Sequence, residues 1–384
     1  MRLIHTADWH LGRLFHGVRL VADQAHVLEQ FVQLVAEVRP DAVLIAGDIY
    51  DRAVPPDDAV DLLNDVLERI VRGLGVPVVM VAGNHDSPRR LGFAARLLGP
   101  QGLHIAGPLQ SDVVKLDVRD EHGPVRVVAI PYAEPVTARA TLGDESIHDH
   151  EAALRAFVGR ARADVPPGTR QVLVTHAFVA GSLTSESERP LSVGGAGTVA
   201  ADVLNDFDYV ALGHLHRPQS VHDERLRYAG SLLKYSFQEH DQSKSVAVVE
   251  LGAHPGERPH VELVTLSARH DVRVVEGTLS EVMAAADGDS RRDDYICARL
   301  LDKGSLLNAM GRLQEVYPNA LSIEFPKLMP DPSQSPALVD PGALSEVEHF
   351  AAFFEYVAGE PLSAAERAAF LAVADELARG EGET

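Results

Sequence analysis

Apolar and polar positions along this chain fall into blocks, and the clearest block is residues 76–82, an apolar, valine-rich run. It stops at the polar cluster GNHD of residues 83–86. A run of this length and composition is typical of a buried strand. Similar runs end at Ala7, Ala46, Thr175 and Leu212, and each is followed by a polar cluster. We therefore expect five buried strands, each ending in a turn that carries polar side chains.

Helical repeats separate the first three of these runs. Apolar residues recur at positions 28, 31, 32 and 35, and again at positions 60, 63, 67 and 70. This spacing places them on one face of an amphipathic helix, so the first three runs are expected to form βαβ units. In sheets with helical crossovers, ligands gather outside the carboxyl ends of the strands. The polar clusters are therefore expected to converge on one site.

The middle of the chain predicts a second sheet. Strand-like runs occur at residues 125–130, 225–229 and 245–251, and a helix-like segment lies at 152–163. The Gly- and Ser-rich stretch at residues 182–198 is expected to form a long loop near the site. These runs favour an α/β fold in which a second sheet packs on the first.

The polar clusters stop near residue 269. Strand-like and helix-like runs then alternate as βαβαβ up to residue 325, which predicts a compact second domain. Prolines with serine and aspartate follow in residues 327–344 and predict a semi-extended linker.

Two short helices are expected within residues 345–380. Ser345 with Glu348, and Ser363 with Glu366, have the spacing of the capping box that starts a helix. Both helices carry an apolar face, and such faces need a cover. They could pack on each other or on the second domain, or they could bind a partner protein.

The polar clusters supply candidate metal ligands of three chemical kinds. The carboxylates, imidazoles and amide are Asp8, Asp48, His10, His176, His214, His216 and Asn84. Because the set contains oxygen and imidazole ligands but no thiolate, it favours manganese, iron or catalytic zinc. Seven ligands are too many for one ion, so we expect a two-metal site able to clamp a phosphoryl group.

Five motifs, in order, carry a resemblance to a known family. They are DxH at residues 8–10, GDxxD at 47–51, GNHD at 83–86, a histidine after a strand at 176, and GHxH at 213–216. This series resembles the calcineurin-like metallophosphoesterases, and an ordered set of motifs is more specific than any single one. The surrounding stretches HTADWHLGR, GDIYDRAVPP and YAGSLLKYSF are similar to the SbcD-type nuclease subunits of that family.

The resemblance implies an architecture. It is a four-layer αββα metallophosphoesterase sandwich over residues 1–268, a smaller α+β capping domain at 269–326 that contributes to DNA recognition, and a C-terminal helical hairpin at 345–380. In SbcD-type chains such a hairpin grips an SbcC-type, SMC-like ATPase. The resemblance also implies a homodimer within a heterotetramer.

Residue roles follow from matching motif to motif. The resemblance places Asp8, His10, Asp48 and His216 around one ion, and Asp48, Asn84, His176 and His214 around the other, with Asp48 as the bridge. His85 is expected to protonate the leaving 3′-oxygen rather than bind metal, a role that histidine can take near neutral pH. Asp86 is expected to accept a hydrogen bond from the His85 ring and orient it.

Composition changes this picture in two ways. The net charge of −21 counts against strong DNA binding by this chain alone, although bound cations and a partner could supply positive charge. Arg13, Arg52 and Arg89 follow the motif strands and are candidates for contacts with DNA phosphates; solvated surface arginines are the alternative.

The single cysteine, the lack of a signal peptide and the lack of a membrane-spanning run favour a cytoplasmic protein that does not enter membranes.

The sequence therefore predicts an enzyme, an Mn²⁺-dependent DNA nuclease with two Mn²⁺ per chain; Mg²⁺ and iron are alternative metals. Exonuclease action at duplex ends and endonuclease action on hairpins or single strands, in DNA end processing and repair with an SbcC-type ATPase, are what the resemblance implies. The alternatives are a stand-alone phosphodiesterase or phosphatase for small esters and a non-enzymatic scaffold that kept the fold.

Overall fold

The computed structural model describes residues 1–188, 197–302, 306–326, 345–358 and 361–380. The chain separates into two compact units, Met1–Val272 and Arg273–Thr384. The expected linker at residues 327–344 lies outside the described residues. Among the helices described, none is long and apolar enough to cross a membrane.

The first unit contains a mixed sheet of six strands. Their order is β16 (His260–Thr265), β15 (Ser245–Glu250), β1 (Arg2–Thr6), β4 (Ala42–Ile45), β5 (Val78–Val81) and β6 (Leu103–Ala106). β1, β4, β5 and β6 run parallel, while β15 and β16 form an antiparallel edge. The expected runs at the start of the chain are thus neighbouring parallel strands, and their carboxyl ends share one edge.

A second mixed sheet also has six strands. Their order is β13 (Gln219–Val221), β14 (Asp223–Tyr228), β12 (Tyr209–Gly213), β9 (Arg170–His176), β8 (Gly123–Ile130) and β7 (Val114–Asp120). β14, β12, β9 and β8 are parallel, and β13 and β7 are antiparallel to their neighbours. β9 and β12 pair in register up to His176 opposite Gly213, so their ends also meet.

The two sheets pack face to face through a shared apolar core. Leu3, Leu44 and Val79 of the first sheet and Val127 and Val174 of the second belong to one buried cluster. Alternate residues of these strands point the other way and are also buried, as expected of strands covered on both faces. The fold is therefore α/β with two mixed sheets.

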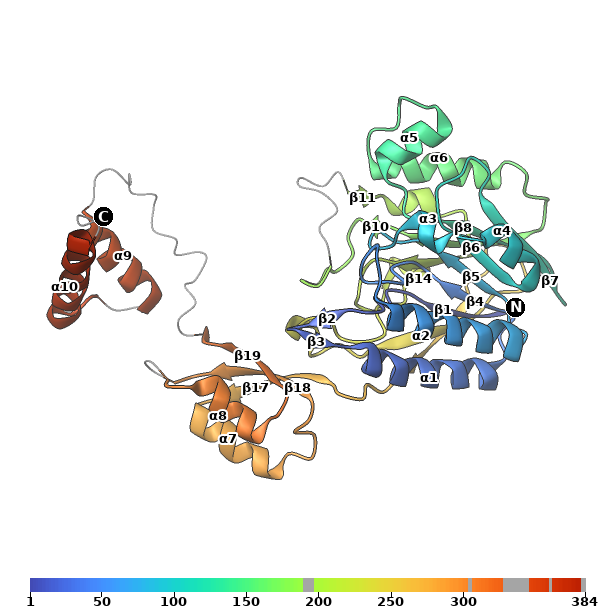
Figure 1. The fold of residues 1–384 in the computed structure, drawn as a ribbon. Helices are drawn as coiled ribbons and strands as arrows, with labels where there is room; N and C mark the ends of the chain where they lie inside the picture. The colour runs from blue at the N-terminus through green and yellow to red at the C-terminus, as the bar shows by residue number, and fades with distance from the viewer. Residues whose placement is uncertain (189–196, 303–305, 327–344, 359–360, 381–384) are drawn as a thin grey trace. The chain divides into compact units, whose positions relative to one another are not determined.

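Helices flank the sheets in the first unit. They are α1 (Val21–Val38), α2 (Asp57–Glu68), η1 (Arg69–Gly73), α3 (Pro88–Leu91), α4 (Ala95–Leu98), η2 (Gly99–Gln101), α5 (Pro135–Leu142) and α6 (His150–Arg162). In Figure 1, α1 and α2 lie on one side of the two sheets, and α5 and α6 lie on the other. Leu154 and Phe157 of α6 pack into the core of the second sheet. The remaining short elements are β2 (Leu14–Phe15), β3 (Val18–Arg19), β10 (Phe178–Val179), β11 (Thr198–Val199), η3 (Ala201–Leu204) and η4 (Phe237–Glu239).

The second unit begins with a β/α region in the expected order of strands and helices. Its elements are β17 (Val272–Gly277), α7 (Leu279–Ala285), η5 (Ala286–Gly288), β18 (Tyr295–Leu300), α8 (Ala309–Val316) and β19 (Ala320–Glu324). The three strands form one sheet, and Ile296, Leu300 and Leu313 lie in its core.

Two helices follow, α9 (Glu346–Ala358) and α10 (Ala364–Gly380). Both start with the predicted capping boxes: the Ser345 amide donates to Glu348 at 2.7 Å, and the Ser363 amide donates to Glu366 at 2.9 Å. The rings of Phe350 and Phe370 stack 4.0 Å apart, so the helices pack on each other. The side chains of Val357 and Leu377, which continue the expected apolar faces, lie outside the described residues.

Candidate dimetal site

Polar side chains from five strand ends converge in the first unit. Those after β1, β4 and β5 come from one sheet, and those after β9 and β12 come from the other. Three sets of residues each place potential ligand atoms within 4.8 Å of one another: Asp8 with His10 and His216, Asp8 with Asp48 and His176, and His10 with Asp51 and His85. The site therefore lies where the two sheets meet.

The backbone at this site is strained. Four of the candidate ligands have a positive φ, at 51° for Asp8, 45° for His10, 47° for Asp48 and 111° for His214. Non-glycine residues in such conformations cost roughly 1–3 kcal/mol each and are concentrated at functional sites. The local fold thus gives up stability to aim these side chains inward.

Glycines in the motifs allow the loops to approach each other. A Cβ atom on Gly83 would lie 2.1 Å from Asp48 Oδ1, and one on Gly213 would lie 1.8 Å from the Ala46 carbonyl oxygen. Both distances are far below van der Waals contact. The glycines of GNHD and GHxH are therefore required by packing around the ligands.

The first ligand group is arranged around two imidazoles. His10 Nε2 and His216 Nε2 lie 3.1 Å apart. The Nδ1–H of His216 donates to Ser187 Oγ at 2.6 Å, which leaves His216 Nε2 without a proton. Two nitrogens bound at about 2.1 Å to one ion at a right angle would lie about 3.0 Å apart. The spacing fits one cation held by Asp8, His10 and His216.

Asn84, His176 and His214 form a further set of candidate ligands, arranged around the Asn84 side-chain oxygen. The Nδ1–H of His176 donates to the Ala46 carbonyl at 3.0 Å, so its Nε2 is an acceptor. That Nε2 lies 2.8 Å from Asn84 Oδ1, and His214 Nδ1 lies 3.2 Å from the same oxygen. His176 Nε2 and Asn84 Oδ1 are both acceptors, so a cation bound by both would relieve their repulsion.

Asp48 lies between the histidines of the two proposed ions, His10 on one side and His176 on the other. Its Oδ2 is 3.7 Å from His10 Nε2 and 3.5 Å from His176 Nε2. One carboxylate thus faces histidines of both groups, the position that a bridging ligand requires.

Electrostatics supports the same interpretation. Burial lowers the pKa of His10, His176, His214 and His216, which favours the neutral imidazole, the form that binds metal. Burial, and next the charge of Asp48, raise the pKa of Asp8. His10 Nδ1 is buried without a hydrogen-bond partner among the described residues. Buried acidic and imidazole groups that lack positive charge fit a site built for cations.

His85 lies beside the ligands and is oriented by backbone. Its amide donates to Asp48 Oδ1 at 2.8 Å, and its Nδ1–H donates to the Asp51 carbonyl at 2.8 Å. The ring's other nitrogen, Nε2, faces the site 3.9 Å from Asp48 Oδ2.

The expectation that Asp86 orients the His85 ring is corrected by these contacts. Asp86 Oδ2 accepts from the amides of Ile49, at 3.1 Å, and Gly83, at 2.9 Å. Its Oδ1 accepts from the amide of Tyr50 at 2.9 Å. The carboxylate is turned away from the ring because these loop amides satisfy it. Asp86 therefore ties the turn after β5 to the turn after β4.

The three candidate arginines occupy different environments. Arg13 is partly buried; it donates to Asp51 Oδ1 at 3.0 Å and lies over the Tyr235 ring, 4.9 Å from its centroid. Arg52 and Arg89 are exposed. Only the latter two are therefore free of a packing role.

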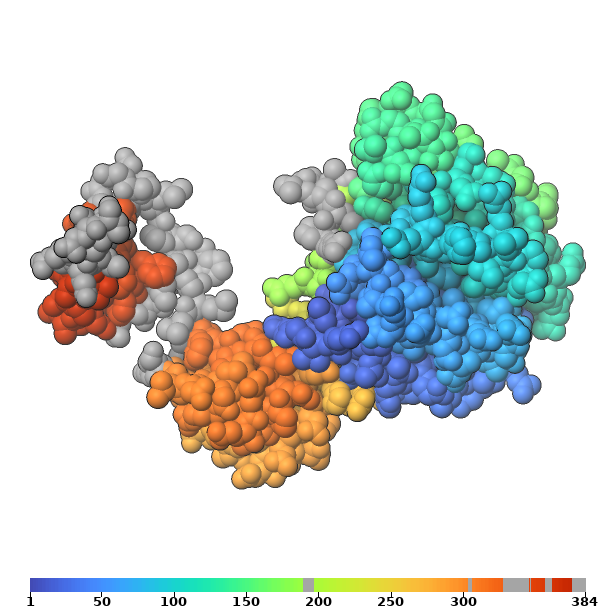
Figure 2. Space-filling view, in the orientation of Figure 1, coloured from blue at the N-terminus to red at the C-terminus, as the bar shows by residue number. Residues whose placement is uncertain are grey.

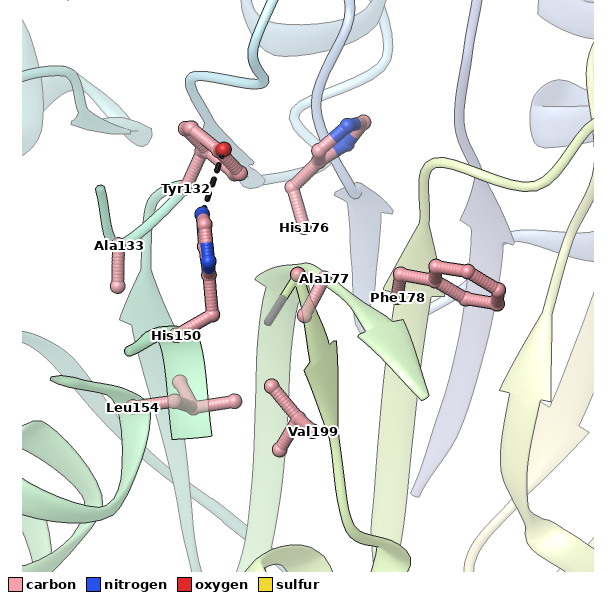
Figure 3. A pocket seen from close by; sticks show the side chains of 9 residues that line it. Tyr132, Ala133, His150, Leu154, His176, Ala177, Phe178 and Val199 are labelled. Atoms are coloured by element: carbon pink, nitrogen blue, oxygen red, sulfur yellow. Dashed lines mark hydrogen bonds between the residues drawn. The ribbon is translucent and has the colours of Figure 1, made fainter. Parts of the chain in front are cut away.

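Some residues near the site have no motif that could have revealed them. Ser187, Glu188, Glu239 and Lys244 surround His216 and are described below. On the other side, Tyr132 hydrogen-bonds His150 at 2.7 Å beside a small pocket that reaches His176 (Figure 3). Tyr132 follows β8, so its place after a strand was a weak signal; His150 begins α6 and gave none.

Comparison with known families agrees with this geometry. Residues 1–218 match the calcineurin-like phosphoesterase family, and this is more than half of the chain. The chain belongs to that family, with a dimetal site of histidine and aspartate typical of its members.

A second match makes the assignment narrower. Residues 268–358 match the C-terminal domain of SbcD, described as the type 5 capsule protein repressor C-terminal domain. The chain is therefore an SbcD-like nuclease, a metal-dependent phosphoesterase.

Solved structures also match this chain, at low sequence identity. The calcineurin-like phosphoesterase YfkN from Bacillus subtilis is 11% identical with a TM-score of 0.38, over 70% of this chain and 92% of that one. A dimetal phosphatase from Danio rerio is 16% identical with a TM-score of 0.37, over 69% and 99%. TT1561 of Thermus thermophilus is 15% identical with a TM-score of 0.39, over 69% and 99%. The assignment rests on the two family matches.

Proposed function

We propose that this chain hydrolyses DNA phosphodiesters with two Mn²⁺ ions, acting in the cytoplasm on duplex ends as an exonuclease and on hairpins or single strands as an endonuclease. The observation that carries the proposal is the pair of acceptor clusters joined by Asp48, with His85 beside them. Asp8, His10, Asp48 and His216 would hold one ion, and Asp48, Asn84, His176 and His214 the other.

The donor set supports Mn²⁺. Mixed carboxylate, amide and imidazole ligands suit manganese, and the described site contains no thiolate that would select a softer metal. When bound, two such cations would supply positive charge beside the phosphate and lower the pKa of water, so that hydroxide is available as the nucleophile near neutral pH.

His85 would move the proton in this reaction. Its Nδ1–H is engaged by the Asp51 carbonyl, so the proton that it passes on would be the second proton of the imidazolium form, carried on Nε2, which faces the site. A proton delivered from Nε2 to the leaving 3′-oxygen avoids forming an alkoxide, and general acid catalysis of this kind is worth about 100- to 10,000-fold in rate. Asp86 supports the reaction through the loops that it joins.

DNA contact would fall to exposed arginines. Arg52 lies on the turn after β4 and Arg89 in α3, after the GNHD turn; both are exposed, so both can reach a phosphate. Arg13 would act as a packing residue for the site, because its guanidinium is engaged by Asp51 and Tyr235. With a net charge of −21, this chain would depend on a partner for most of its attraction to DNA.

The C-terminal part would serve recognition and assembly. We assign residues 1–268 to an αββα nuclease domain, 269–326 to a capping domain that contributes to DNA recognition, 327–344 to a linker and 345–380 to the segment that binds an SbcC-type ATPase. Phe353, Leu371 and Val373 of the two helices are 62%, 43% and 57% exposed even though the helices pack on each other. Truncation after Met329 should keep Mn²⁺-dependent cleavage and abolish co-purification with the ATPase.

A homodimer would form through the first unit. Apolar side chains from α2, the segment before it and the segment between α3 and α4 line one groove; Val54, Val60 and Phe93 are exposed there and Leu67 is half-buried. These stretches, blue and cyan in Figure 2, adjoin on the face turned to the viewer. Phe93 is 80% exposed, which is costly for a phenylalanine unless another surface covers it.

The experiment that tests the nuclease proposal measures nucleotide release from an end-labelled linear duplex with Mn²⁺. It compares the wild type with His85→Ala. The matched control is His122→Ala, which changes a histidine on the exposed turn between β7 and β8. We expect cleavage by the wild type and control, and a loss of at least about 100-fold in His85→Ala with both ions retained.

Two outcomes would contradict parts of the proposal. Loss of bound Mn²⁺ in His85→Ala would make His85 a ligand rather than the proton donor. Turnover of small phosphate esters without DNA cleavage, with the ATPase added, would favour a stand-alone phosphodiesterase.

A further inference from the structure

A cluster of buried and half-buried polar side chains lies behind His216, on the Nδ1 side of its ring. It consists of Ser187, Glu188, Glu239 and Lys244, and we call it the Glu239 cluster. Glu239 is fully buried and Lys244 is 6% exposed. Burying two charges is costly unless each is paired and hydrogen-bonded, so such a cluster needs a structural or functional reason.

The ring of His216 is connected to Glu239 by two routes. Its Nδ1–H donates to Ser187 Oγ at 2.6 Å, and the Ser187 hydroxyl donates in turn to Glu239 Oε1 in a very short hydrogen bond. The same Nδ1 lies 3.3 Å from Glu239 Oε1 directly. Both routes place the proton on Nδ1 and leave Nε2 free to bind a cation.

The backbone of His216 is held by the same cluster. Glu188 Oε1 accepts from the His216 amide at 2.7 Å, and Lys244 Nζ donates to the His216 carbonyl at 2.8 Å. Lys244 Nζ also donates to Glu239 Oε2 at 2.6 Å, so Glu239 has a counter-charge without using the oxygen that faces His216. Ring and peptide are thus fixed together.

Within the part of the chain that the structure describes, the histidines of the other ion have no carboxylate hydrogen-bonded to their rings. The Nδ1–H of His176 donates to a neutral backbone carbonyl, that of Ala46. A carboxylate is a stronger acceptor than a carbonyl and raises the basicity of the histidine that donates to it. The two halves of the site therefore differ in how their histidines are supported.

We propose that Glu239 is a positioning residue that fixes His216 as an Nε2 ligand. It would selectively increase the affinity for the ion held by Asp8, His10 and His216. The ion bound by Asn84, His176 and His214 does not depend on it. This inference rests on the ligand assignment of the proposed function. It makes a prediction about metal affinity that requires no DNA cleavage.

The test is a titration of the full-length, metal-free protein with Mn²⁺, followed by electron paramagnetic resonance and calorimetry. We expect two ions in the wild type. In Glu239→Gln one ion should bind about 10- to 100-fold more weakly, and the other should be unchanged. Glu224→Gln, which alters a glutamate paired with Arg227 elsewhere in the second sheet, should match the wild type.

Folding is controlled by a second variant. Glu239→Gln removes the carboxylate paired with buried Lys244, so the double variant Glu239→Gln/Lys244→Met removes both charges of the pair and lowers that cost. It should fold and still show one weakened ion. Equal weakening of both ions, or no weakening, in a folded variant would overturn the role of Glu239.

The wild-type titration separates this inference from the proposed function. Fewer than two ions in the wild type would overturn the two-metal assignment itself. Two ions without DNA cleavage, with the ATPase added, would refute the nuclease activity; the variants alone would then decide the role of Glu239.

Discussion

Removing the Asp86 carboxylate should damage the scaffold of the site before its chemistry. In Asp86→Ala the amides of Ile49 and Gly83 lose their acceptor while buried, and the partly buried amide of Tyr50 loses its own. An unpaired buried donor costs about 1–3 kcal/mol, so the two fully buried amides alone predict a loss of roughly 2–6 kcal/mol. That is a large share of the roughly 5–15 kcal/mol by which a domain is stable.

Urea unfolding measures this loss, and Asp86→Asn is the matched variant. The single side-chain oxygen of the asparagine can replace Oδ2 and keep the Ile49 and Gly83 amides paired. Asp86→Asn should therefore lose clearly less free energy of unfolding than Asp86→Ala. Metal content should fall in parallel with stability, because the two tied turns carry Asp48 and Asn84. An Asp86→Ala protein that keeps wild-type stability and both ions but loses cleavage would refute this reasoning and place Asp86 in the chemistry.

Three further predictions concern other parts of the first unit. Gly83→Ala should lose Mn²⁺ in a titration, since its Cβ would lie 2.1 Å from Asp48 Oδ1; normal Mn²⁺ binding would show that the turn can shift. Arg170 holds the pKa of Asp120 below its ordinary value, so this pair's stabilisation is complete above the unfolded pKa of about 4 and declines as the pH falls below it. Urea unfolding of Asp120→Asn should show a deficit of about 3 kcal/mol at neutral pH that narrows below about pH 4, whereas a constant deficit would argue against the ion pair. Phe93→Ser should shift the protein from dimer to monomer in analytical ultracentrifugation, and an unchanged dimer would place the interface elsewhere.

Much of the site could be predicted from the sequence because each ligand directly follows an apolar run. Once those runs are neighbouring strands, Asp8, Asp48 and Asn84 come to one edge by topology. β7 (Val114–Asp120) alternates apolar and polar residues, so its period of two could have revealed it, whereas β16 (His260–Thr265) is largely exposed and gave no comparable signal.

Contacts between distant segments were beyond the reach of pattern analysis. Asp86 is next to His85 in sequence, yet its carboxylate pairs with amides more than thirty residues earlier in the chain. Glu239 reaches His216 across 23 residues with no spacing rule to predict it. Adjacency in sequence suggested the wrong partner in the first case, and distance concealed the right one in the second.

The position of the ligands at the junction of two sheets gives any bound cation a mechanical role. Each ion would cross-link the first sheet to the second, because neither sheet supplies a complete set of donors. Ions that bind only when the two sheets are packed together stabilise the folded state by about 2.7 kcal/mol each at a free concentration of 100 times the dissociation constant. Chelation should therefore loosen the domain as a whole, and a count of bound ions per chain also reports how much of a preparation is intact.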